Sequence, residues 1–375
     1  MPDVGSAVRE SFRHQAADAI AAAGTGTHTA ARVWRRLGRA GLTAQLYEGA
    51  GQRPDAGRLG ELLGALDAGC EVGVALSVCV QVATSIPILL GGRASETVLR
   101  ACDAALDGTA VTALCATDAG AVGSCLTELA TTVRLADDHL VVDGGKRWIT
   151  SACFSNQLLV LARHRPGDHF TSFTWVLVPA TAPGVAVEPA DTGFFAGSGI
   201  GHVWLDGVRL SRDHVVGRVG QGLVSFGRHI ATERLAGGLW AAAIARRALA
   251  GTHDSLLRRT ARGRTLWDND AVRLAFARCL VEHRRLEAMC RQVADAISGP
   301  DALLASMLLK AGAADALEKI LTACSQMQGA DGFRTGGIQQ LRAEAAMFGI
   351  AGGTTETMLA AIADRAADLL AVRPS

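Results

Sequence analysis

The sequence predicts an α+β protein in which an N-terminal helical domain, a middle β-barrel or sandwich domain and a C-terminal four-helix bundle follow one another. Residues 5–110 are rich in Ala, Leu and Arg with helical spacing. Residues 111–219 change to short segments separated by Gly, Asp and Pro, which is typical of strands. Long helical patterns return from Gly222. The predicted domains are residues 1–112, 113–220 and 221–375.

In the first domain, apolar residues at helical spacing predict one helix and its exit over Val33–Leu42 and another over Leu59–Leu66. The segment Val72–Leu90 is apolar and long enough to raise the question of a membrane span. Polar residues and a proline interrupt it, namely Gln81, Thr84, Ser85 and Pro87. We therefore expect a buried helix of a protein that does not cross a membrane.

The middle domain contains six clear strand patterns, several of them alternating in character. They are Thr131–Ala136, His139–Gly144, Leu158–Arg163, Phe173–Val178, Gly184–Pro189 and His202–Leu210. So many short strands in about a hundred residues predict a small barrel or sandwich. The last domain contains four long helical patterns with short connections, which predict an antiparallel bundle: Leu223–Arg259, Asn269–Ser298, Ala302–Gln328 and Thr354–Leu370.

Composition narrows the classes of function. The formal net charge of the 375 residues is +1, which points to neither nucleic acid nor an anionic membrane as a partner. The nine cysteines lie between Cys70 and Cys324 without a C-x-x-C pair. That pattern indicates reduced thiols and predicts no metal site and no disulfide framework. The N-terminal residues lack the pattern of a signal peptide, so we expect a cytoplasmic protein.

Three short motifs carry candidate chemistry. Ala116–Ser124 reads ATDAGAVGS and Gly144–Thr150 reads GGKRWIT, in which alternation puts Trp148 and Thr150 on one strand face. A flat aromatic ring beside hydroxyl groups suits a planar cofactor, although a turn and a core tryptophan explain each motif alone. In Gly349–Met358, a glycine pair precedes Thr354, a good helix N-cap. Such a loop either faces a ligand or serves only as a cap.

Taken together, the order of the domains and the motifs resemble the acyl-CoA dehydrogenase family over nearly the whole chain. Each motif is a modest signal, but seven occur in the family's order. They are Ala116–Ser124, Gly144–Ala152, Leu205–Leu210, Gly217–Gly222, Arg259–Leu266, Gln326–Phe333 and Ile350–Met358.

The resemblance implies FAD as the cofactor. It assigns the flavin ring and the near phosphate to Thr117, Ser124, Trp148 and Thr150, with Thr354 and Glu356 closing the other side. It also implies that the positions matching Arg259, Gln326 and Gly329 reach the FAD of a neighbouring subunit, and therefore a homodimer or homotetramer. A guanidinium pairs well with a pyrophosphate, whereas the alternative for Arg259 is a solvated side chain.

Dehydrogenation of an acyl thioester needs a base for the α proton. Most members of the family carry that glutamate where this chain has Gly352, whose backbone N–H is implied to bind the thioester carbonyl. Glu233 lies in an apolar stripe with Ile230, Gly237 and Trp240, where desolvation would raise its pKa. The motifs IAGGT (Ile350–Thr354) and TERLAGG (Thr232–Gly238) occur together, and this combination resembles the long-chain and isovaleryl branches of the family. The resemblance favours Glu233 as the base over a simple salt bridge.

Three functions remain open from the sequence. The first is an FAD-dependent acyl-thioester dehydrogenase of a specialised pathway. Its substrate would be an acyl-CoA or an acyl group on a carrier protein, and its electron acceptor an electron-transferring flavoprotein or oxygen. The second is a flavin monooxygenase on the same fold, which needs no base for an α proton. The third is a flavin-binding paralogue without turnover.

Overall fold

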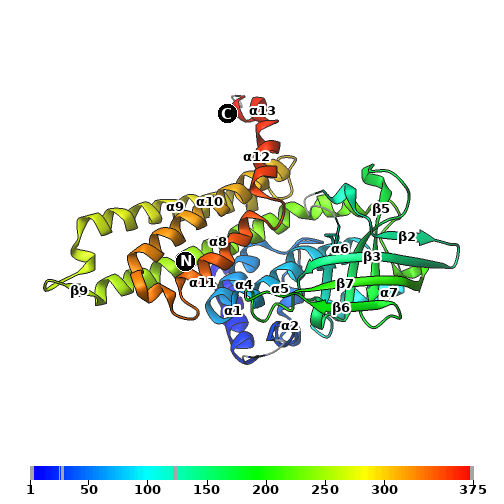
Figure 1. The fold of residues 1–375 in the computed structure, drawn as a ribbon, viewed down its shortest axis with the longest axis horizontal. Coiled ribbons are helices and arrows are strands. Elements are labelled where there is room, and N and C mark those ends of the chain that lie inside the picture. The colour runs from blue at the N-terminus through cyan, green and yellow to red at the C-terminus, as the bar shows by residue number, and fades with distance from the viewer. Residues whose placement is uncertain (1–3, 25, 27–28, 94, 121–124, 372–375) are drawn as a thin grey trace. The chain divides into compact units, whose positions relative to one another are not determined.

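The computed structural model describes residues 4–24, 26, 29–93, 95–120 and 125–371. The chain divides into two compact units, residues 1–233 and residues 234–375. Helices, then strands, then helices follow one another along the chain (Figure 1). This order confirms the predicted α+β fold class, while the exact limits of three domains stay a prediction.

Among the described residues of the first unit, seven α-helices and one π-helical turn precede the sheet. They are α1 (Val4–Ala21), α2 (Thr29–Arg39), α3 (Leu42–Gln45), α4 (Ala56–Gly69), α5 (Val72–Val80), the π-helical turn η1 (Gln81–Ser85), α6 (Ile86–Gly91) and α7 (Glu96–Leu106). Helices α4 and α7 begin where the side chains of Asp55 and Ser95 accept hydrogen bonds from backbone N–H groups. The predicted helix around Trp34 is α2, which buries its apolar face.

The apolar segment α5–η1–α6 runs from Val72 to Gly91 and is long and apolar enough to cross a membrane. In the structure, however, 89% of its most apolar window is buried within the protein. The segment therefore serves as a core helix of the first unit, as its interrupting polar residues indicate.

The strands of the first unit form one mixed sheet in the order β6-β7-β3-β2-β4-β5-β8, with β1 paired to β4 in parallel (Figure 1). Their bounds are β1 (Thr112–Cys115), β2 (Thr132–Leu135), β3 (His139–Ile149), β4 (Gln157–Arg163), β5 (Phe173–Pro179), β6 (Val185–Pro189), β7 (Gly201–Ser211) and β8 (Val215–Val216). The six predicted strands correspond to β2 through β7. Their inward side chains, such as Val142, Val160 and Val203, form one apolar core.

Helix α8 (Gly222–Arg258) leads from the first unit into the second. The other elements of the second unit are the short hairpin β9 (Thr260–Ala261) and β10 (Arg264–Thr265), and the helices α9 (Asp270–Ala296), α10 (Ala302–Gln328), α11 (Ile338–Ala345), α12 (Thr355–Ala363) and α13 (Ala366–Leu370). Helix α9 begins at the side-chain cap of Asn269, as the polar residues before its apolar pattern indicate.

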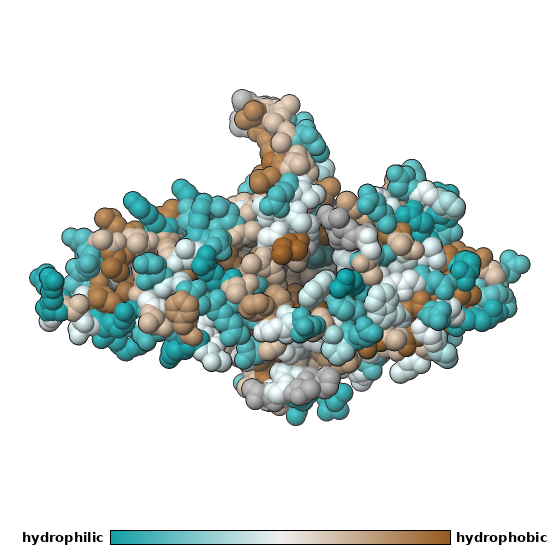
Figure 2. Space-filling view, viewed as in Figure 1, coloured by the Kyte–Doolittle hydropathy of each residue, from teal (hydrophilic) through white to brown (hydrophobic). Residues whose placement is uncertain are grey.

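The last helical segment differs from the prediction. In place of one helix over Thr354–Leu370, the chain forms α12 and α13, which project from the other helices of their unit (Figure 1). Met358 is the buried residue of α12 and packs against Leu304, Met307 and Ala311 of α10. Apolar side chains remain exposed over these projecting helices (Figure 2). A helix with so little packing has weak support for continuing as one element.

Candidate active site

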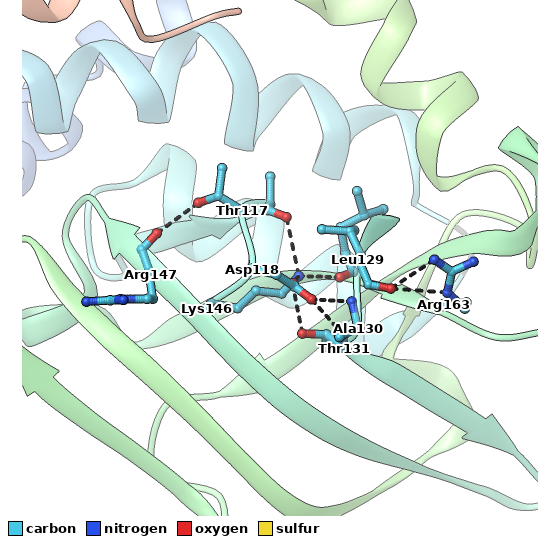
Figure 3. Close-up of polar contacts among 10 residues, drawn as sticks. Thr117, Asp118, Leu129, Ala130, Thr131, Lys146, Arg147 and Arg163 are labelled. Carbon is cyan, nitrogen blue, oxygen red and sulfur yellow. Dashed lines mark hydrogen bonds and ion pairs between the residues drawn. The ribbon is translucent and has the colours of Figure 1, made fainter. Parts of the chain in front are cut away.

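A buried ion pair joins the two β motifs of the first unit. Lys146 of β3 is fully buried and contacts the carboxylate of Asp118, whose side chain is 2% exposed (Figure 3). Asp118 also accepts hydrogen bonds from the backbone N–H groups of Ala130 and Thr131 at 2.6 and 2.7 Å. Burial lowers the pKa of Lys146, and the charge of Asp118 opposes this effect. The pair fixes the strand of Trp148 against the loop that begins at Thr117.

Arg163 holds the other end of that loop. Its guanidinium donates to the carbonyl of Leu129 at 3.0 Å (Figure 3) and to the carbonyl of Thr127 at 2.8 Å. The same side chain lies 4.9 Å from the ring centre of Phe173. The segment after Cys125 is therefore held by two charged side chains, Arg163 of β4 and Asp118, which pairs with Lys146. Ser124, a predicted flavin contact, lies outside the described residues.

Trp148 lies at the end of β3 with an unusual backbone. Its φ is 57°, a strained value for a residue other than glycine, and its side chain is 56% exposed. The pairing of β3 with β7 shifts register between Lys146 and Ile149, so a bulge interrupts the strict alternation expected from the sequence. The ring of His202 meets Trp148 edge-on at 5.6 Å. A large aromatic side chain held outward by strained backbone fits a planar cofactor.

Two hydroxyl residues flank this tryptophan. Thr117 donates to the carbonyl of Arg147 at 2.8 Å, which leaves its oxygen able to accept another hydrogen bond. Thr150 is half-buried, while Ile149 between it and Trp148 is buried. The first unit thus brings Thr117, Trp148 and Thr150 to the same end of β3, although the bulge there interrupts the alternation from which a shared face of Trp148 and Thr150 is predicted.

Glu233 is the last residue of the first unit and lies on α8. Its carboxylate accepts a hydrogen bond of 2.9 Å from the hydroxyl of Thr84 in η1. Ile230, one turn before it, is buried, and so is Trp240 further along the helix. Both residues of the predicted apolar stripe are thus buried, whereas Gly237 and Glu233 itself are only half-buried.

The glycine loop of the second unit is held by two buried cations. Arg234 donates from Nε to the carbonyl of Gly352 at 3.2 Å, and Lys310 donates to the carbonyl of Phe348 at 2.6 Å. Burial lowers the pKa of Lys310 to about 8, with the nearby charge of Arg234 acting in the same direction. Gly352 has φ 71° and Gly353 has φ 99°, which glycine adopts without steric cost.

The glycine pair inside α8 has two different environments. A Cβ on Gly238 would lie 2.8 Å from the side chain of Leu309, so close packing of α10 explains this glycine. A Cβ on Gly237 would meet nothing within 4 Å. Another side chain therefore approaches the helix backbone closely at Gly238, where the neighbour is Leu309, and not at Gly237.

Arg259 is neither solvated nor remote from its predicted partners. Its guanidinium donates to the carbonyls of Met327 and Gln328 at 2.9 and 3.0 Å, at the end of α10. Gly329 follows with φ 61°, and Gln326 is exposed. The second unit therefore brings the three residues predicted to reach a neighbouring cofactor to one place, although their role there stays a prediction.

Thr354 caps α12, as predicted. Its side chain accepts a hydrogen bond from the backbone N–H of Thr357 at 3.3 Å. Glu356 lies in the first turn of the helix and is exposed, and its charge acts on Lys310. Contact of Thr354 and Glu356 with a flavin stays a prediction.

Comparison with known proteins decides the family. Residues 113–208 match the acyl-CoA dehydrogenase middle domain, and residues 220–367 match the acyl-CoA dehydrogenase C-terminal domain. The chain belongs to the acyl-CoA dehydrogenase family. The predicted flavoprotein oxidoreductase and its FAD cofactor are thereby confirmed at the level of the family.

Several family members are similar over most of the chain. An acyl-[acyl-carrier-protein] dehydrogenase MbtN of Mycobacterium sp. (strain MCS) is 29% identical over 317 residues, which cover 80% of this chain and 76% of that protein. The FAD complex of PigA superimposes with a TM-score of 0.87 at 17% identity over 98% of each chain. Glutaryl-CoA dehydrogenase from Mycobacterium smegmatis gives a TM-score of 0.85 at 18% identity, over 100% of this chain and 97% of that one. These two structures support the fold.

Sequence reasoning missed three residues that contact predicted site residues or the segments that carry them, each within its own unit. Thr84 binds Glu233, Lys310 binds the carbonyl before the glycine loop, and Lys146 pairs with Asp118. Lys146 lies within the motif Gly144–Thr150, and Thr84 and Lys310 are polar side chains inside apolar segments. That pattern is the signal that could have found them, since buried polar groups need partners.

Proposed function

We propose that this chain catalyses the FAD-dependent α,β-dehydrogenation of an acyl thioester, with Glu233 as the base that removes the α proton. The observation that carries the proposal is the environment of Glu233. Its carboxylate lies on α8 beside buried apolar residues and is held by a hydroxyl group. The position of the usual family base is Gly352, which has no side chain to take a proton.

In the proposed dehydrogenation, each of three residues of the chain has its own role. Glu233 takes the proton from the α carbon of the thioester. The backbone N–H of Gly352 donates to the thioester carbonyl and stabilises the negative charge that develops on its oxygen. Arg234 supports that role because it fixes the carbonyl of the same residue. FAD, when bound, supplies the acceptor for the β hydride.

The described residues fit a flavin. Trp148 presents an exposed ring on strained backbone, and Thr117 retains hydrogen-bonding capacity beside it. Thr150, Thr354 and Glu356 are the further side chains proposed to contact the cofactor. The Asp118–Lys146 ion pair supports the site because it ties the Thr117 loop to the Trp148 strand.

We propose a carrier-protein thioester as the preferred substrate and a CoA thioester as the alternative. The relatives named acyl-[acyl-carrier-protein] dehydrogenase match 80% of this chain in one case and 75% in another. A relative named acyl-CoA dehydrogenase IpdE1, from Mycobacterium tuberculosis, is 35% identical over 27% of this chain and 26% of that protein. The monooxygenase alternative is not favoured, because these relatives carry dehydrogenase names.

We also propose an electron-transferring flavoprotein as the acceptor and a homodimer or homotetramer as the working form. The exposed apolar side chains of the second unit support self-association. They include Leu274 and Val281 on α9, at 64% and 50% exposure, and Leu370 of α13, at 81%. Light scattering of the purified protein tests this part, and a monomer at micromolar concentration would contradict it.

The test of the function is an anaerobic reaction. The FAD-loaded protein is mixed with matched acyl groups on a carrier protein and on CoA, and the flavin absorbance and the thioester products are followed. We expect bleaching of the flavin together with one equivalent of α,β-unsaturated thioester per flavin. Unchanged flavin with every thioester would contradict the proposal. Bleaching by a nicotinamide cofactor with an oxygenated product in air would favour the monooxygenase.

A further inference from the structure

We propose that Thr84 is the positioning residue of Glu233, and that the π-helical turn Gln81–Ser85 serves to present its hydroxyl to that carboxylate. The assignment of Glu233 as a base rests on the proposed function. The contact itself rests on the structure alone, because Thr84 and Glu233 both belong to the first unit.

The turn η1 interrupts an otherwise continuous helical segment. It lies between α5, which ends at Val80, and α6, which begins at Ile86. A π-helical turn widens the backbone ring by one residue, weakens the regular hydrogen bonding and is frequent at functional sites. All five of its residues are buried, so the irregularity is not a fraying end in contact with water.

Side chains from other elements hold the turn in place. The hydroxyl of Tyr47 donates to the carbonyl of Val82 at 2.6 Å. The amide of Gln81 donates to the carbonyl of Thr112 at 2.7 Å and accepts from its N–H at 3.2 Å. Ser85 donates to the same carbonyl at 3.2 Å. The turn is therefore fixed from the side of Tyr47 and from strand β1, which leaves Thr84 with a defined direction.

The hydroxyl of Thr84 acts as a donor to Glu233. The side chain is completely buried, and its oxygen lies 2.9 Å from Oε2 of the carboxylate. An ionised carboxylate only accepts hydrogen bonds, so the hydroxyl must donate. Bulk water does not reach the Thr84 hydroxyl, while Glu233 itself is half-buried. The contact favours the charged form of Glu233 and restricts the orientation of its carboxylate.

The thiol of Cys79 is close enough to Glu233 for the charge of the carboxylate to affect its pKa. Cys79 is buried near the end of α5, just before the π-helical turn, and burial, together with the negative charge of Glu233, raises the pKa of its thiol to about 12. The side of the carboxylate that faces Thr84 and Cys79 therefore lies against buried protein. In such surroundings a single hydrogen bond has a larger effect on a charge than it has in water.

The chain offers a matched control at the residue before Glu233. Thr232 is 2% exposed, and its hydroxyl is buried without a hydrogen-bond partner among the described residues. Thr84→Val and Thr232→Val make the same chemical change at two fully enclosed sites. Only the first removes a donor to Glu233.

The experiment measures the pKa of Glu233 in the full-length FAD-loaded protein by carbon-13 NMR of labelled glutamate carboxyls, with Glu233→Gln to assign the signal. We expect Thr84→Val to raise that pKa by about one unit, because a donor to the charged form is lost. Thr84→Ser keeps the donor and should stay within a few tenths of a unit of the natural protein. Thr232→Val should leave the pKa unchanged.

Flavin reduction by the thioester gives the second readout. In Thr84→Val the pH at which the rate is half-maximal should rise by the same amount, and the rate at pH values below that midpoint should fall about tenfold with little change in KM. A Thr84→Val protein with an unshifted pKa and pH profile would overturn the proposal, as would an equal shift in Thr232→Val. If Thr84→Val fails to fold, Thr84→Ala replaces it. Failure of the natural protein to reduce flavin rejects the proposed function, while the NMR titration still decides the role of Thr84.

Discussion

Glu233 and Arg234 are neighbours on α8, yet they are held in different ways. The carboxylate of Glu233 receives one hydroxyl from a buried side chain, Thr84, in the first unit. The guanidinium of Arg234 donates to a backbone carbonyl of the glycine loop and to Ser306 at 3.4 Å, in the second unit. A side chain that takes up a proton needs a contact that sets its pKa. A side chain that holds a loop in place needs hydrogen bonds to the main chain of that loop.

Removal of the loop contact should give the largest loss of stability. Arg234 is 8% exposed and supports the carbonyl of Gly352, so Arg234→Met should lower the free energy of unfolding by about 2–4 kcal/mol. Urea denaturation measures the change. Arg258→Met, on the exposed end of the same helix, is the control and should stay within about 0.5 kcal/mol of the natural protein. Equal effects in both variants would reject the structural role of Arg234.

A side chain at Gly352 should give a smaller effect of the same kind. The φ of 71° disfavours any residue with a Cβ, so Gly352→Ala should cost about 1–2 kcal/mol in thermal or urea unfolding. Gly237→Ala is the matched control, because its Cβ enters open space within a helix and should be neutral or stabilising. A stabilised Gly352→Ala protein would contradict the observed loop conformation.

Lys310, the second cation that holds the glycine loop, predicts that the free energy of unfolding depends on pH in the alkaline range. The pKa of Lys310 lies at about 8 in the folded protein, below the ordinary 10.5, so the unfolded chain binds more protons between these values. The free energy of unfolding should therefore rise with pH across that window through this residue, by about 1 kcal/mol after allowance for solvent screening. Lys310→Met should remove this rise. An identical pH dependence in the variant would show that Lys310 titrates normally.

His229, one turn before Glu233 on α8, predicts a smaller dependence of the free energy of unfolding on pH in the acidic range. Burial lowers the pKa of His229 to about 4 from the ordinary 6.5, with the charges of Arg53 and Arg228 acting in the same direction. The unfolded chain binds more protons between these values, so the free energy of unfolding should fall as pH decreases through that window. His229→Gln should weaken this fall, whereas His14→Gln, at an exposed position of α1, should not. Parallel pH curves for all three proteins would contradict the prediction.

Much of the fold and part of the candidate site could be predicted from the sequence. The alternation of Thr131–Ala136 and its neighbours predicts the strands, and the glycine at position 352 directs attention to Glu233. The contacts of Thr84 and Lys310 were not predictable, because each joins residues far apart in the chain, 149 and 38 positions. The bulge at Trp148 was hidden because a regular strand and a bulged one share the same alternating residues. The break between α12 and α13 depends on packing that helical periodicity does not record.

The central claim is that Glu233 removes the α proton, and its most direct test is flavin reduction in a stopped-flow instrument. The FAD-loaded natural protein and Glu233→Gln are mixed anaerobically with the acyl thioester that bleaches the natural protein. We expect the rate constant of reduction in Glu233→Gln to fall by about 10²–10⁴, with FAD still bound at one per chain. Reduction of Glu233→Gln within a factor of three of the natural rate would contradict the claim.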